Sequence, residues 1–227
     1  MQEMSLSEAI HSARALRHFK PDQVPDAVLA KLIDAGVRAP TGSNLQNWRF
    51  VIVTDPDLRR QLAHLYRDSM KIAQNALSYR KRPAHMTEKA QERMFASARH
   101  LAEHFAEVPV LLMAWLHLPQ DQENPNLSAD DAQSYIRLSG ASIYGAVQNI
   151  ILTCRAFGLG TVLTTVMAYK EAEARKVLGV PADMRLFAVL PIGYPAEGHG
   201  HGRVVRLPVE QVTFRDRFGN NWPPTSS

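Results

Sequence analysis

The amino-acid sequence predicts a domain of mixed helix and sheet, either α+β or α/β, in which helices cover a small sheet. Two long apolar runs, residues 108–118 and 184–195, are typical of buried strands, and a shorter run over residues 48–55 predicts a third. Segments with the 3.6-residue period of helices separate these runs. Because each helix and strand must bury an apolar face, this interleaving favours a layered sandwich.

Three helices are expected in the N-terminal third of the chain. Ser5 and Glu8 form a capping-box pattern that favours a helix over residues 5–16. A second helix is expected within residues 21–40, where proline and aspartate mark the start and glycine and proline the end. Helical period returns over residues 56–70, directly after the first strand.

Residues 66–107 are predicted to be a helical lid insertion, interrupted at Pro83 and rich in methionine, tyrosine, histidine and arginine. The chain has no repeat and no clear domain boundary, so we expect residues 1–227 to form a single domain.

The second half of the chain contains further helices and an extended end. A polar acidic loop is expected over residues 119–131, followed by a strong helix over residues 134–160. Residues 161–166 predict a short strand or turn, and residues 170–180 predict a helix. Residues 203–227 have no compact partner of their own and are expected to form an extended C-terminal arm.

Composition excludes several classes of protein. Cys154 is the one cysteine among 227 residues, so neither an intrachain disulfide nor a cysteine metal cluster can form, which suits a reducing cytoplasm. No apolar signal region opens the chain, and the longest apolar run is too short to span a membrane. The net charge of +4 favours anionic ligands over nucleic acid, since no long block of lysine and arginine accompanies it.

Motifs of common catalytic sites are missing from the sequence, including the dinucleotide-binding glycine motif, the P-loop and the nucleophile elbow. His100 and His104 stand four residues apart, a spacing that can bind a metal, but their charged helix favours a solvated face. His199 and His201 lie in a glycine-rich loop with little specificity. We therefore expect no metal site.

Arginines and one polar loop are the remaining candidates. Arg14 and Arg17 lie three residues apart, so a helix would place both on one face, where they either bind a phosphate or neutralise the helix end. Arg206 either binds the same anion as Arg14 and Arg17 or is exposed to solvent. The polar loop, residues 38–47, by itself favours an ordinary turn before the strand that begins at Trp48.

Five segments in order resemble the flavin-dependent nitroreductase family. They are ARALRHF at 13–19, APTGSNLQNWRFVIV at 39–53, GAVQNIILTCRAFGLGTVLTT at 145–165, LPIGYPAEG at 190–198 and RLPVEQV at 206–212. The resemblance implies an α+β, nitroreductase-like three-layer sandwich with a small mixed sheet. It also implies an intertwined homodimer with FMN at the subunit interface.

The resemblance further implies an activity. Members use NAD(P)H to reduce nitroaromatic, quinone or similar electron-poor small molecules by a ping-pong mechanism through flavin N5. The cofactor carries this chemistry, so no catalytic side chain is expected. Two alternatives are a reductive dehalogenase-like or flavin-fragmenting branch of the same superfamily, and a flavin-binding or storage protein with little turnover. Neither nucleic acid nor a membrane is expected as a partner.

The resemblance implies cofactor-binding roles for particular basic residues. Arg14 and Arg17 would hold the FMN phosphate, although Ala13 and Ala15 stand where the family usually has an arginine and a serine. Arg206 would then be the third phosphate ligand, and residue Arg203 could substitute for it.

Polar residues would contact the rest of the flavin. The amides of Asn44 and Gln46 match positions that reach the ribityl chain and the polar edge of the ring, whereas Trp48 is expected in the core. The segment of Leu163, Thr164 and Thr165 would lie along the flavin near N5. Substrate contacts are expected from the lid: Tyr66, Met70, Tyr79 and Met94.

Overall fold

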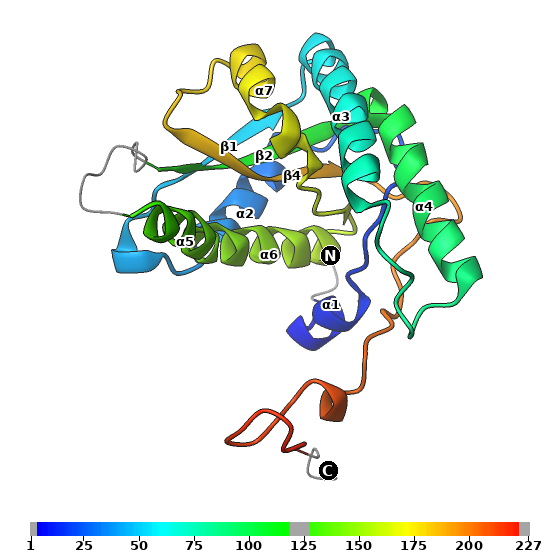
Figure 1. The fold of residues 1–227 in the computed structure, drawn as a ribbon. Coiled ribbons are helices and arrows are strands. Elements are labelled where there is room, and N and C mark those ends of the chain that lie inside the picture. Colours follow the sequence, from blue (N-terminus) through cyan, green and yellow to red (C-terminus); the bar gives the residue numbers. More distant parts are fainter. Residues whose placement is uncertain (1–3, 119–127, 223–227) are drawn as a thin grey trace.

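The computed structural model describes residues 4–118 and 128–222 (Figure 1). Its centre is a four-stranded sheet in the order β1-β2-β4-β3. The strands are β1 (Trp48–Val53), β2 (Val110–His117), β3 (Gly160–Thr161) and β4 (Met184–Gly193). The three apolar runs therefore form β1, β2 and β4, as predicted.

The sheet of the described residues is antiparallel at each of its three pairings, so the expectation of a mixed sheet within this chain is wrong. For the pairing of β1 with β2, the helices α3 (Pro56–Leu77) and α4 (Glu88–Glu103) supply the reason, because they follow β1 as a helical hairpin. The hairpin returns the chain to the end of the sheet that it left, and Val53 pairs with Leu111 at the start of β2. Antiparallel neighbours follow from such a connection, whereas parallel neighbours need a crossover to the opposite end.

Helices cover both faces of this sheet, which confirms the three-layer sandwich. On one face, α2 (Asp26–Gly36) and α6 (Ala141–Ala156) pack against a core that includes Leu112 and Ala114 of β2. On the other face, α3, α4 and α7 (Glu171–Leu178) enclose Met113 and Trp115 of the same strand. Since side chains alternate along a strand, β2 is apolar from Val110 to Leu116 because both of its faces are buried.

The first helix, α1 (Leu6–Ser12), is shorter than the predicted 5–16. The chain leaves the helix after Ser12 because residues 13–19 lie along the sheet instead. Leu16 N donates to Thr161 O at 3.0 Å, and Phe19 forms an isolated antiparallel bridge with Pro195. These pairings with β3 and with the end of β4 replace the hydrogen bonds that further helix would have made.

The strong helix predicted over residues 134–160 consists of α5 (Ala129–Ser139) and α6, interrupted at Gly140. The Ser128 hydroxyl accepts a hydrogen bond from Asp131 N at 3.1 Å and caps α5, so the helix begins inside the predicted loop. The remainder of that loop prediction lies outside the described residues. No described helix is long and apolar enough to cross a membrane.

The predicted lid begins in the middle of α3, and residues 78–87, around Pro83, are the non-helical turn between α3 and α4. The C-terminal arm leaves the body as an extended chain with one 3-10 turn at Val209–Gln211 (Figure 1). Its apolar side chains are open to solvent: Val205 is 83% exposed and Phe218 is 92% exposed.

Candidate functional site

The candidate site lies where residues 13–19 pass β3 and the segment that follows it. Glycines allow this close approach. A Cβ added at Gly160 would lie 3.0 Å from Leu16 Cδ1, and one added at Gly193 would lie 3.3 Å from Phe19 Cβ. Substitution at either position would force this part of the N-terminal segment away from the sheet.

Arg17, Tyr66 and Thr164 meet beside this segment. Tyr66, from α3, is 3% exposed, and its hydroxyl lies 3.2 Å from Oγ1 of Thr164, which is 9% exposed. The Tyr66 ring stacks on Phe105 with the ring centroids 4.0 Å apart. We refer to this group of Arg17, Tyr66 and Thr164 as the junction.

Burial shifts the titration of two groups in the junction. Desolvation raises the pKa of Tyr66, opposed by the hydrogen bond from Thr164 and by the nearby charge of Arg17. Desolvation lowers the pKa of the half-buried Arg17. Three residues before Thr164 in the chain, Thr161 Oγ1 is buried and has no hydrogen-bond partner among the described residues. A positive charge and an unpaired buried hydroxyl are features that a polar anionic ligand would satisfy.

A cavity of about 700 Å³ opens between α3 and α4 next to Arg17. Met70 and Met94, two of the predicted substrate contacts, line it together with Val166. Tyr66 is instead packed in the core, and Tyr79 is 77% exposed outside the lining. We call this the arginine cavity, from the four arginines in its lining: Arg17, Arg80, Arg82 and Arg99.

The other predicted phosphate ligands lie nearer the solvent. The Arg14 guanidinium is next to the loop before the arm, since a Cβ at Gly202 would lie 3.7 Å from Arg14 Nη1. Arg203 and Arg206 are exposed on the arm, and Arg206 Nη1 donates to the carbonyl of Val205 at 2.9 Å.

The predicted flavin-facing segment forms a short bridge to the sheet. Thr164 N donates to Val189 O at 3.0 Å, and Val189 N donates back to Thr164 O at 2.8 Å. Leu163 and Thr165, on either side, are exposed. The backbone of this segment is thereby fixed, while two of its side chains remain accessible.

The polar loop is strained and fixed in place. Ser43, Asn44 and Gln46 have φ values of 51°, 54° and 47°, in the left-handed region that non-glycine residues rarely adopt. Gln46 Nε2 donates to Asn44 Oδ1 at 3.1 Å, and Gly42 N donates to Ser142 Oγ at 3.1 Å. Strain of this kind is often retained at ligand sites.

Among the described residues, no side-chain hydrogen bond joins the polar loop to the junction. The side-chain hydrogen bonds of the loop end on its own residues, on α2, on β1, on α6 and on β2, where Asn47 Nδ2 donates to His117 O at 2.8 Å. Trp48, directly after the loop, is buried in the core as predicted. The candidate cofactor residues thus form two separate groups on the chain.

Comparison with known proteins decides the family. The model of the nitroreductase family matches residues 10–194. The chain belongs to the nitroreductase family. The resemblance of the sequence to this family is therefore confirmed over most of the chain.

Relatives of this nitroreductase-family chain have several different names. A protein of Thermus thermophilus named NADH dehydrogenase is 29% identical over 88% of this chain and 91% of its own length. An iodotyrosine deiodinase of Thermotoga neapolitana is 28% identical over 80% of this chain and 84% of its own length. Human iodotyrosine deiodinase 1 is 24% identical over 90% of this chain, which spans 66% of the human protein.

Solved structures show the same fold. Iodotyrosine deiodinase bound to FMN and 3-iodo-L-tyrosine matches with a TM-score of 0.65 and 24% identity, covering 89% of this chain and 95% of that one. A BluB-like flavoprotein from Clostridium difficile matches with a TM-score of 0.67 and 23% identity, covering 92% of this chain and 98% of that one.

A column of four histidines is the feature of this nitroreductase-family chain that sequence reasoning missed. The ring of His18 stacks between those of His100 and His199 with centroids 3.8 Å apart on each side, and His104 stacks on His100 at 4.1 Å. The predicted solvated face at His100 and His104 is wrong, because both side chains are half-buried against other rings.

The column favours the neutral form of two of its imidazoles, those of His18 and His100. Desolvation and the neighbouring histidines lower the pKa of His18 to about 4, and desolvation also lowers that of His100. No group of three or more histidine, cysteine, aspartate or glutamate residues in the described part of the chain is placed to hold a metal ion. Stacked rings agree with this finding, since the nitrogen lone pairs of parallel imidazoles do not converge on one point.

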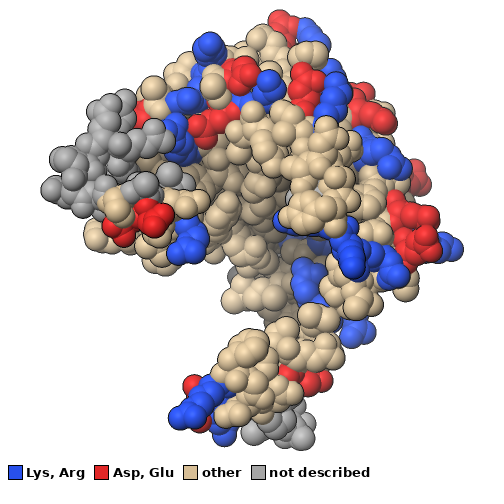
Figure 2. All heavy atoms as spheres, viewed as in Figure 1, with Lys and Arg blue, Asp and Glu red and all other residues tan. Residues whose placement is uncertain are grey.

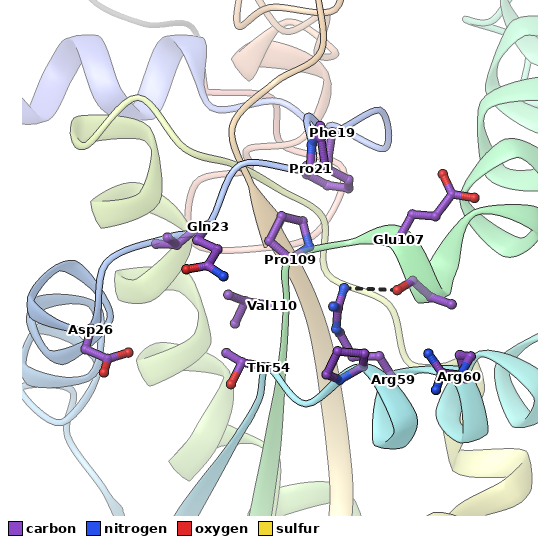
Figure 3. Close-up of a pocket in the computed structure, with 13 residues that line it drawn as sticks. Phe19, Pro21, Gln23, Asp26, Thr54, Arg59, Arg60, Glu107, Pro109 and Val110 are labelled. Carbon is purple, nitrogen blue, oxygen red and sulfur yellow. Dashed lines mark hydrogen bonds between the residues drawn. The ribbon is translucent and has the colours of Figure 1, made fainter.

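A second cavity, of about 690 Å³, lies at the end of the sheet where β1 ends and β2 begins (Figure 3). Thr54, Pro109 and Val110 line it. Arg59 Nη1 donates to the carbonyls of Ala106 at 3.0 Å and Val108 at 2.6 Å, so this guanidinium holds the turn into β2. Its role here is structural.

Proposed function

We propose that the chain is an FMN-dependent oxidoreductase that accepts reducing equivalents from NADH or NADPH and passes them to an electron-poor small molecule, such as a nitroaromatic compound or a quinone. The observation that carries the proposal is the junction. Arg17 and Thr164, which are 147 residues apart in the sequence, both lie next to Tyr66 beside a cavity of about 700 Å³.

The residues present fit FMN chemically. Arg17 offers a guanidinium fork for a phosphate group, with Arg14 on the same segment. The unpaired hydroxyl of Thr161 can be satisfied by a polar ligand group. The cavity volume falls in the range of about 300–1,000 Å³ that is usual for small-molecule sites. FMN, when bound, supplies hydride transfer in both half-reactions.

The chain's own contribution is binding and orientation. Arg17 would neutralise the phosphate. Thr164 pairs with Val189 through both of its backbone groups and so fixes this segment, and the backbone N–H groups of Leu163 and Thr165 would hold the ring by hydrogen bonds that do not reorganise during the reaction. The paired amides of Asn44 and Gln46 would offer donors and an acceptor to the polar edge of the ring. None of these side chains needs to gain or lose a proton.

A homodimer would unite the two groups of candidate ligands, with the polar loop of one protomer reaching the junction of the other. Two features support this part of the proposal. Within the described residues, β1 pairs only with β2, and an unpaired strand edge is a ready docking site for another chain. The arm, residues 203–222, carries exposed apolar side chains such as Val205 and Phe218 and is an extended segment of the kind that could cover a partner.

Reductive dehalogenation is the second candidate function. It is favoured by the iodotyrosine deiodinase relatives and by the neighbouring threonines Thr164 and Thr165 at the predicted flavin contact. The same flavin site would serve either reaction, so the candidates differ in the acceptor. A panel of nitroarenes, quinones and halogenated phenols, each tested with both nicotinamides, separates them.

A titration of the purified protein with FMN tests the proposal. We expect saturable binding of one FMN per chain. The binding is measured by the changes in flavin absorbance and fluorescence. A protein that is colourless as purified, and that neither binds added FMN nor oxidises NAD(P)H in its presence, would rule the proposal out.

A further inference from the structure

We infer that the arginine cavity selects acceptors that carry an anionic group, a carboxylate or its equivalent, on an aromatic or otherwise planar apolar body. The inference rests on the proposed function and names the substrate class of that site. It concerns the three arginines that the FMN phosphate does not require: Arg80, Arg82 and Arg99.

The lining of the cavity carries positive charge only. Of its described residues four are arginines and none is aspartate or glutamate. In the part of the chain that the structure describes, none of the four forms an ion pair with a carboxylate. Figure 2 shows lysine and arginine side chains gathered at the hollow beneath the lower ends of α3 and α4. Charges of one sign around a concave site attract ligands of the other sign.

These three arginines come from two elements that line the cavity. Arg80 and Arg82 belong to the turn between α3 and α4, where Arg82 also donates to the carbonyl of Met86. Arg99 lies on α4, four and five residues after Phe95 and Met94. This spacing places the three α4 side chains on one face, which lines the cavity.

The rest of the lining is mainly apolar. Met70 and Ala73 come from α3, Met94 and Phe95 from α4, and Val166 from the segment after Thr165. Thioether and aromatic side chains adapt to flat apolar surfaces. A ligand that fits this cavity therefore has an apolar body, and its charged group reaches the arginine turn at the mouth.

Three nitrobenzenes that differ only beyond a methylene group test the inference: 4-nitrophenylacetate, 4-nitrobenzyl alcohol and 4-nitrobenzylamine. At neutral pH they are an anion, a neutral molecule and a cation, and the methylene group keeps their rings electronically similar. We expect kcat/KM of the FMN-loaded protein to be at least about tenfold higher for the anion than for the neutral compound, and lowest for the cation. The preference should shrink in high salt, because exposed arginines are screened.

The double variant Arg82→Gln/Arg99→Gln should reduce this preference to less than about threefold, and the single variant Arg99→Gln should reduce it in part. A matched control is Lys89→Gln/Arg93→Gln, which removes the same charge from α4 at positions outside the cavity lining and should keep the full preference. Equal kcat/KM for all three compounds in the unmodified protein would overturn the inference.

Equilibrium binding provides a readout that does not depend on turnover. Calorimetry should show that 4-nitrophenylacetate binds the protein more tightly than the alcohol does, and that the double variant loses the difference. If the protein reduces no acceptor, the proposed function fails, while this binding comparison still decides the inference. If the double variant instead weakens FMN binding, or slows only reduction by NADPH, the arginines serve the cofactor or the reductant and the inference is wrong.

Discussion

The hydrogen bond between Tyr66 and Thr164 predicts that these two side chains stabilise the fold together. Tyr66→Phe removes one hydroxyl and keeps the stack on Phe105, whose ring centroid lies 4.0 Å away. Thr164→Val removes the other hydroxyl at nearly constant volume. Thr164 keeps both backbone hydrogen bonds to Val189 in either case, so the substitutions test the side-chain contact alone.

The magnitude follows from the burial of both groups. A net hydrogen bond contributes about 1 kcal/mol, and leaving a buried partner unpaired costs about 1–3 kcal/mol. Each single variant should therefore lower the free energy of unfolding by about 1–2 kcal/mol. The loss of unfolding free energy in the double variant should be smaller than the sum of the losses in the two single variants, by roughly 1 kcal/mol, because the double variant leaves no unpaired hydroxyl. For 227 residues, 1 kcal/mol corresponds to a shift in Tm of about 2 °C.

Urea denaturation of the cofactor-free protein measures this cycle, at one fixed protein concentration so that association does not vary. The coupling should be present before FMN is added, since the two hydroxyls bond to each other. Strictly additive losses, or a coupling that appears only in the FMN-loaded protein, would refute the assignment of this contact.

Three further predictions concern the surroundings of the junction. Arg17→Gln should raise the dissociation constant for FMN by about 10- to 100-fold, the loss of one charge-assisted hydrogen bond. Arg93→Gln, at an exposed position of α4 outside the cavity lining, should leave it unchanged, and equal effects of the two substitutions in an FMN titration would contradict this. The pKa of His18 is lowered to about 4 in the folded chain. Between pH 6.5 and 4, His18 is therefore protonated in the unfolded chain but stays neutral in the folded chain. The urea midpoint should therefore fall over this range, and His18→Gln should flatten the fall; an unchanged slope would count against the column. Burial raises the pKa of the Cys154 thiol, so iodoacetamide should modify it only in unfolding concentrations of urea.

The elements that sequence predicted well are those whose pattern is local. The apolar runs around Trp115 and Val189 are continuous because both faces of the sheet are covered, and that signal is visible in the residues themselves. The polar loop before Trp48 was likewise identifiable from its turn residues. Its strained geometry at Ser43, Asn44 and Gln46 was not, since single-residue dihedral angles are set by the contacts around them.

The features that sequence did not predict depend on distant contacts. The first helix ends early because Leu16 pairs with Thr161, a competition that no local pattern records. The histidine column joins His18, His100 and His199, which are far apart in the chain, so pair spacing on one helix suggested a solvated face. Tyr66 was expected to contact substrate, but α3 turns its ring into the core.

We propose that this chain binds a flavin that a nicotinamide reduces and a small molecule reoxidises. The most direct test mixes the FMN-loaded protein anaerobically with NADH or NADPH and then adds a nitroarene or a quinone. We predict that the visible flavin absorbance bleaches within seconds and returns when the acceptor is added. A flavin that stays oxidised with both nicotinamides would contradict the account and would favour a protein that binds or stores FMN without turnover.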